Sequence, residues 1–231
     1  MILYLNLFLF GFLPPLAWLF YFLKKDSNQE SKINILKAFI AGGLMTIPAY
    51  FVETFFLSSK LPLSPFLALL ATNFIFVAAF EEIIKFVVFK AGFENKPFLD
   101  EPTDFLIYMI TIALGFATFE NVFILYQFDF ADVISTSMVV GIIRFLGPNL
   151  LHSIASGLLG FFACWSKIRK NQAFVILGIL TAIALHGIFN LLIIKTDSIF
   201  SIFLLALILI MTFFVLLKSF KILKVVNKNN L

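Results

Sequence analysis

Hydrophobic residues fill seven long stretches of the chain, and short polar connections separate them. Each stretch holds about 20 residues or more, the length that an α-helix needs to cross a bilayer. The predicted spans cover residues 2–23, 33–57, 62–90, 104–127, 146–166, 172–194 and 198–217. Residues 131–145 are moderately apolar and precede Gly147-Pro148, which predicts a separate short helix lying at the outer membrane interface. The pattern therefore predicts an all-α membrane bundle, with residues 1–231 forming a single integral membrane domain.

Composition and charge place the chain in a membrane and orient it. It is 61% hydrophobic and 13% charged, whereas a soluble domain is about 45–50% apolar and about 25% charged. Lysine and arginine gather in alternate connections, with 13 on one side of the predicted bundle and two on the other. By the positive-inside rule the amino terminus lies outside and the carboxy terminus in the cytoplasm, which requires an odd number of spans. These basic residues form no dense stripe, so the expected partner is a lipid bilayer and not nucleic acid.

Four of the hydrophobic stretches carry polar residues that a bilayer disfavours. These are Glu81, Glu82 and Lys85 in the third span, Glu120 and Asn121 in the fourth, His152 in the fifth, and His186 and Asn190 in the sixth. A charged side chain at mid-bilayer costs about 2.5–3.5 kcal/mol on insertion scales, so such residues usually act together. Lys85 is one helical turn from both glutamates, but one lysine cannot neutralise two acids. A proton, a metal ion or a second positive group is needed as well.

The position of each residue within its span predicts that these side chains share one site. Counted from the cytoplasmic ends, Glu120, His152 and His186 lie at similar depth, because each residue adds about 1.5 Å of rise. The paired glutamates lie one to two turns lower, unless their helix ends nearer Phe93. We expect all five side chains to meet in one polar cavity between spans three to six, with Arg144 near its mouth. Two histidines with one or two glutamates are a common ligand set for catalytic Zn²⁺.

These residues resemble the motifs of the PrsW family of membrane proteases. The sequence contains Glu81-Glu82-x-x-Lys85, then Asp104-x-x-x-Tyr108 leading into Gly115-Phe-Ala-Thr-Phe-Glu120-Asn121. His152 in an apolar helix and His186-Gly-x-x-Asn190 follow in the family's order. PrsW proteins are in turn similar to the CAAX prenyl-endopeptidase and bacteriocin-processing superfamily, which has a histidine where this chain has Glu120. The resemblance covers residues 75–195, the expected catalytic core.

The resemblance implies an intramembrane endopeptidase of a bacterial cytoplasmic membrane. Its substrate would be a single-pass membrane protein, such as an anti-sigma factor, cleaved near the outer face. Carried over by position, Glu81 and Glu82 supply the carboxylate that activates water, while Glu120, His152 and His186 bind the metal or complete the acid/base set. Asn190 supports His186 or stabilises the oxyanion, and Lys85, Asn121 and Arg144 have supporting roles. Zn²⁺ is the expected metal, and a metal-free glutamate mechanism is the alternative.

Buried carboxylates, a lysine and histidines also fit other classes of protein. An ion-coupled or proton-coupled transporter needs such groups near mid-membrane. The sequence shows no inverted repeat, and no pair of corresponding broken spans marks a transport site. A catalytically inactive relative that acts as an immunity or scaffold protein is the third hypothesis, although every motif position is filled.

Overall fold

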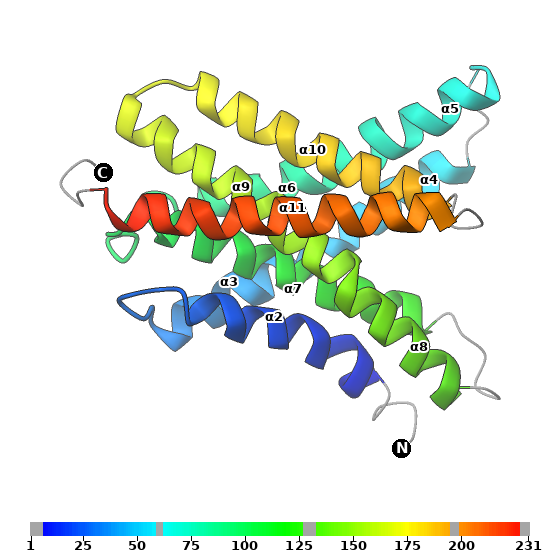
Figure 1. The fold of residues 1–231 in the computed structure, drawn as a ribbon, viewed down its shortest axis with the longest axis horizontal. Coiled ribbons are helices and arrows are strands. Elements are labelled where there is room, and N and C mark those ends of the chain that lie inside the picture. The colour runs from blue at the N-terminus through cyan, green and yellow to red at the C-terminus, as the bar shows by residue number, and fades with distance from the viewer. Residues whose placement is uncertain (1–6, 59–61, 127–132, 195–198, 227–231) are drawn as a thin grey trace.

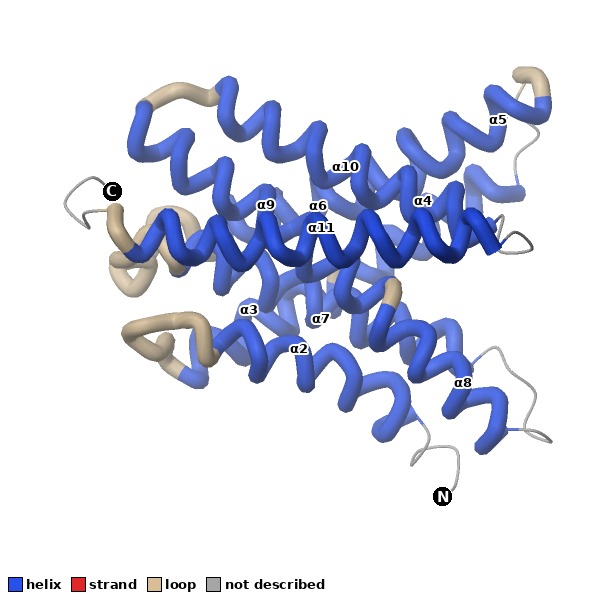
Figure 2. Tube along the Cα trace, viewed as in Figure 1, coloured by secondary structure: helices blue, strands red, loops and turns tan. Residues whose placement is uncertain are grey.

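The computed structural model describes residues 7–58, 62–126, 133–194 and 199–226, and every regular element in these ranges is a helix (Figure 2). The first six elements are η1 (Leu7–Phe12), α2 (Leu13–Leu23), α3 (Lys32–Leu44), α4 (Thr46–Ser58), α5 (Pro65–Ala71) and η2 (Thr72–Ala79). The next six are α6 (Phe80–Gly92), α7 (Asp104–Tyr126), α8 (Val133–Leu146), α9 (Pro148–Arg169), α10 (Ala173–Ile194) and α11 (Ile199–Lys224). The elements η1 and η2 are π-helical, and both continue directly into α-helices. The predicted all-α bundle is confirmed.

Six helical stretches of the described chain are long and apolar enough to cross a membrane. They are Lys32–Phe56, Pro65–Gly92, Asp104–Tyr126, Met138–Arg169, Ala173–Ile194 and Ile199–Lys224. The segment Phe8–Leu23 is a shorter apolar helix, and the start of the first predicted span, residues 2–6, lies outside the described residues. The six long stretches and the shorter helix match the seven predicted spans.

The path of the chain agrees with an odd number of passes. Figure 1 shows the α2–α3, α6–α7 and α9–α10 connections at one end of the molecule, together with the end of α11. The start of α2 and the α4–α5 connection lie toward the opposite end. The end that holds the three connections carries the lysines and arginines that close α6, α9 and α11. That this end faces the cytoplasm stays a prediction from the charge distribution.

The chain breaks between α8 and α9 where the sequence predicts it. Gly147 has φ −107° and ψ −94°, outside the helical region, and Pro148 opens α9 at a position where its missing N–H is harmless. The predicted short helix thus exists as α8, although its placement at the membrane interface stays a prediction. By length and composition, the segment from Met138 onward can join the membrane span of α9.

The helix α7 forms the centre of the bundle. It is apolar around its whole circumference, which is typical of a helix surrounded by others, and every residue from Asp104 to Thr118 is buried. Glycines let its neighbours approach closely. A Cβ added to Gly115 would lie 1.9 Å from the Phe39 carbonyl oxygen of α3, and one added to Gly160 of α9 would lie 2.4 Å from the Phe105 carbonyl oxygen. Small residues at such crossings are how membrane helices pack without a hydrophobic driving force.

We predict that Gly115→Ala destabilises the bundle, because the added methyl group meets backbone that cannot move aside. Overpacking of this kind costs about 1–3 kcal/mol. Thermal unfolding of the purified protein in detergent measures the loss. Gly92→Ala is the matched control, since an added Cβ there has no neighbour within 4 Å. Equal unfolding temperatures for the two variants would show that the α3–α7 crossing tolerates a wider spacing.

Candidate active site

Four helices bring the polar residues of the predicted site together. Glu81 and Glu82 stand in the first turn of α6, directly after the π-helical segment η2. A π-helical turn shifts the face that later residues present, and such turns are frequent at functional sites. His152 lies in α9 and His186 in α10, and their ring centroids are 5.1 Å apart in an edge-on arrangement. The helix α6 continues to Gly92, two residues beyond the predicted end, and Glu82 Oε1 lies 2.9 Å from His186 Nδ1, so the glutamates reach the depth of the histidines.

The Lys85 ammonium group lies at the centre of this cluster. Its Nζ donates to Glu81 Oε2 at 3.0 Å and to Glu82 Oε1 at 2.8 Å. It also lies 2.9 Å from His152 Nδ1 and 4.3 Å from the ring centroid of Phe116, a cation–π distance. Lys85 is 0% exposed. These contacts use all three ammonium hydrogens, so the charge is solvated by side chains instead of water.

Glu82 is held on both carboxylate oxygens. Its Oε1 accepts from Lys85 and lies 2.9 Å from His186 Nδ1. Its Oε2 accepts from the Ser156 hydroxyl of α9 at 3.0 Å. This fully buried carboxylate therefore joins α6 to α9 and α10. By contrast, the hydrogen bond from Lys85 occupies only Oε2 of Glu81.

His152 links the central cluster to Glu120. Lys85 is a donor, so His152 Nδ1 accepts and the ring proton resides on Nε2. Nε2 then donates to Glu120 Oε2 at 3.1 Å. Arg144 Nη2 lies 2.8 Å from the same oxygen. Glu120 therefore lies on the far side of the imidazole ring from Glu81 and Glu82, where it is paired with a guanidinium group.

The two asparagines of the predicted site have different surroundings. Asn121 is fully buried, and its Oδ1 accepts from Arg144 Nε. Its Nδ2 donates to Asn149 Oδ1 and to the Gly11 carbonyl, both at 3.2 Å. It thus fixes Arg144 and ties η1 to α7 and α9. Asn190 is half-buried, one turn beyond His186 on α10. Its amide forms no hydrogen bond with the described residues.

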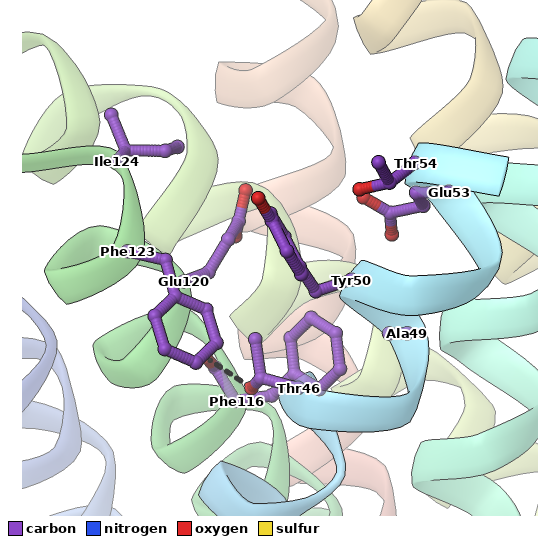
Figure 3. Close-up of a pocket in the computed structure, with 9 residues that line it drawn as sticks. All are labelled: Thr46, Ala49, Tyr50, Glu53, Thr54, Phe116, Glu120, Phe123 and Ile124. Carbon is purple, nitrogen blue, oxygen red and sulfur yellow. Dashed lines mark hydrogen bonds between the residues drawn. The ribbon is translucent and has the colours of Figure 1, made fainter. Parts of the chain in front are cut away.

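A pocket between α4 and α7 opens beside Glu120. It has a volume of about 210 Å³. Figure 3 shows Tyr50 and Glu53 on α4 and Glu120 on α7, all bordering the same space. Glu53 is hydrogen-bonded to Glu81 and lies within electrostatic reach of Glu120 and Lys85. Of the five residues expected to share a cavity, only Glu120 lines this pocket, which lies between the second and fourth predicted spans.

Sequence reasoning did not include Glu53 in the site. The signal was present, because Glu53 is an acid in a long apolar span and such residues are functional candidates by default. Ser156 was not among the predicted site residues either, although its hydroxyl donates to Glu82 Oε2. A hydroxyl gives little signal in the sequence, since serine is common in membrane helices.

The central cluster offers a donor set that suits a metal ion. Glu81, Glu82, His152 and His186 each supply one ligand atom, and these atoms lie within 4.8 Å of one another. Two imidazoles with carboxylates match the donors of catalytic zinc sites. The ammonium of Lys85 contacts three of the same four residues. The carboxylates have further lone pairs, but His152 Nδ1 has only one, so this nitrogen can accept from the ammonium or bind a metal ion and not both. Glu120 does not belong to this donor group.

Comparisons with known proteins identify similar sequences. The family described as "PrsW family intramembrane metalloprotease" matches residues 30–217. Protease PrsW of Geobacillus kaustophilus (strain HTA426) is 28% identical over 191 residues, which cover 81% of this chain and 79% of that protein. Protease PrsW of Clostridioides difficile (strain 630) is 25% identical over 80% of this chain and 78% of its own length. Protease PrsW of Bacillus subtilis (strain 168) is 24% identical over 78% of this chain and 79% of its own length. No solved structure matches the chain.

We predict that Ser156→Ala destabilises the protein more than Ser153→Ala does. Both serines are fully buried on α9. Ser156 donates to Glu82 of α6, whereas Ser153 donates to the Asn149 carbonyl of its own helix. Loss of a hydrogen bond to a buried charge costs about 1.5–3 kcal/mol, against about 0.5–1.5 kcal/mol for a neutral one. Unfolding free energies of the two variants test this, and equal losses would contradict a tightly held Glu82.

Proposed function

Because the chain belongs to the PrsW family of intramembrane metalloproteases and is therefore a membrane-embedded protease, we propose that it hydrolyses a peptide bond of a single-pass membrane protein near the outer membrane face. An anti-sigma factor is the substrate class that the family resemblance suggests. One observation supports the location of the chemistry, namely the buried cluster of Glu81, Glu82, Lys85, His152 and His186. In the described part of the chain, this is where carboxylates, a cation and both histidines converge.

The two adjacent glutamates take different roles in this proposal. Both oxygens of Glu82 are engaged by Lys85, His186 and Ser156, so Glu82 positions the site and holds its charge. Glu81 has one oxygen outside the Lys85 hydrogen bond, and its carboxyl group is hydrogen-bonded to Glu53, which lines the pocket and so connects Glu81 to it. A general base needs a lone pair that can reach water or substrate. Glu81 is therefore the water-activating carboxylate.

The histidines and the remaining polar residues complete the site. His152 and His186, with Glu82, would hold a metal ion, provided that Lys85 withdraws from them. Zn²⁺ held there would polarise the scissile carbonyl and lower the pKa of its water. Glu120 and Arg144 orient His152 through Nε2. If Glu120 is itself a metal ligand, as the family positions suggest, its Oε1 is the available donor, because Arg144 and His152 both contact Oε2. Asn190, one turn from His186, supports that histidine or the oxyanion.

The α4–α7 pocket is the proposed entrance for substrate. Its lining combines apolar and aromatic side chains with Tyr50, Glu53 and Glu120 (Figure 3). A helical substrate has its backbone carbonyls in internal hydrogen bonds, so the segment to be cleaved must unwind before water can attack it. Polar groups at this depth can pair with the backbone groups that unwinding exposes, which a bilayer alone cannot do.

We predict that Glu81→Gln lowers the cleavage rate by at least ~10²-fold, the scale typical of a general base, while the protein stays folded. The assay uses purified full-length protein in proteoliposomes with a panel of single-pass membrane proteins, and fragments are identified by mass spectrometry. Glu94→Gln is the matched control, because Glu94 follows the same helix but lies in the α6–α7 connection. Retained cleavage in Glu81→Gln would assign the base to another residue. No cleavage by the wild type would favour an inactive relative acting as a scaffold or immunity protein.

The metal is tested separately by chelation. Removal of metal from the purified protein should stop cleavage, and Zn²⁺ should restore it, with about one equivalent bound per chain by elemental analysis. His186→Ala should lose the bound equivalent. If the chelated protein cleaves at the wild-type rate, the metal-free glutamate mechanism replaces the metal-dependent one.

A further inference from the structure

A second group of carboxylates gathers at the opposite end of α7 from Glu120. Asp26 and Glu30 belong to the connection between α2 and α3, and Asp104 opens α7. Each supplies one oxygen, and the three oxygens lie within 4.8 Å of one another. Sixteen residues of helix separate Asp104 from Glu120, which is about 24 Å at 1.5 Å per residue. The group is therefore independent of the proposed active site.

The acid cluster of Asp26, Glu30 and Asp104 contains buried oxygens that have no hydrogen-bond partner. Asp104 is 0% exposed and Asp26 is 9% exposed. Asp104 Oδ2 accepts from the Glu101 backbone N–H at 2.7 Å, but its Oδ1 has no partner among the described residues. Both carboxylate oxygens of Asp26 are likewise buried; the backbone N–H groups of Ser27, Asn28 and Glu30 lie near them, but none has the geometry of a full hydrogen bond. Buried carboxylate oxygens are normally paired, because loss of their hydration is costly.

Two more acidic residues lie near the acid cluster and increase its negative charge. Asp100 and Glu101 lie within electrostatic reach of Glu30. Within the described ranges, none of the three carboxylates forms an ion pair with lysine or arginine. Without a cation or a proton, the folded state therefore bears an uncompensated charge here.

The remaining contacts hold the acid cluster in place. The Tyr108 hydroxyl of α7 donates to Glu30 Oε2. Asn28 donates to Glu101, which joins the α2–α3 connection to the α6–α7 connection. Asp104 and Tyr108 form the Asp-x-x-x-Tyr pair of the sequence. The proposed protease mechanism assigns no role to either residue. Their common position suggests that the pair serves this cluster.

We propose that Asp26, Glu30 and Asp104 bind a hard divalent cation, Mg²⁺ or Ca²⁺. Carboxylate oxygens without nitrogen or sulfur donors are the ligands that these ions prefer. Bound there, the ion neutralises the carboxylates and links the α2–α3 connection to the start of the central helix. It stabilises the end of the bundle where α7 begins.

Thermal unfolding of the full-length protein tests the proposal. The chelated protein in detergent is titrated with MgCl₂ in one series and CaCl₂ in another. One of the two should raise the unfolding temperature saturably, by about 5–10 °C at a hundred times its Kd. The ion that saturates at the lower concentration is the better ligand. Luminescence of Tb³⁺, displaced by that ion, gives a second reading of the same site.

Variants locate the effect in the acid cluster. Asp104→Asn and Glu30→Gln should each abolish the saturable shift, and the second variant provides a reading if the first does not fold. Glu94→Gln should keep the shift, since it removes an acid of the α6–α7 connection outside the cluster. Glu82→Gln should keep it too, which separates this ion from one in the active site. No saturable shift with either ion, or an unchanged shift in both cluster variants, would overturn the proposal.

Discussion

The buried ammonium of Lys85 is the interaction on which the site depends. A charge at this depth has no water to solvate it, so its partners must come from the protein. Glu81 and Glu82 supply negative charge from the same helix, and His152 supplies a lone pair from α9. Glu82 extends the network to Ser156 and His186. Removal of one partner from such a group leaves an uncompensated buried charge, which costs about 3–5 kcal/mol.

The central helix α7 connects the features that matter for function. Its middle packs closely against α3 and α9 through glycines, so its position is fixed. One turn beyond this region, Glu120 reaches His152 and the α4–α7 pocket. At its other end, Asp104 contributes to the acid cluster. A rigid central helix can thus hold a reactive group in place while the surrounding helices admit a substrate.

Since the chain belongs to a protease family, the transporter hypothesis is no longer needed to explain the buried charges.

The sequence predicted the spans and the meeting of the polar residues, because both follow from the bilayer as solvent. Apolar runs must be helices, and polar groups within them must find one another. Rotation about a helix axis was not predictable, so the sequence did not show that Glu120 pairs with Arg144 on the far side of His152 from Glu81 and Glu82. Glu53 was missed because it stands alone in its span. The acid cluster was also missed, since it depends on how the α2–α3 connection folds back onto Asp104.

The coupling between Lys85 and Glu82 tests the central claim most directly. Unfolding free energies of the wild type, Lys85→Met, Glu82→Gln and the double variant form a double-mutant cycle. If the ammonium and the carboxylate solvate each other, the coupling free energy should be about 2–3 kcal/mol. The loss of the Lys85–Glu81 pair occurs with and without Glu82, so it cancels in the cycle and the Lys85–Glu82 interaction remains. Losses that add to within about 0.5 kcal/mol would mean that the two groups are independent, and would contradict a site organised around Lys85.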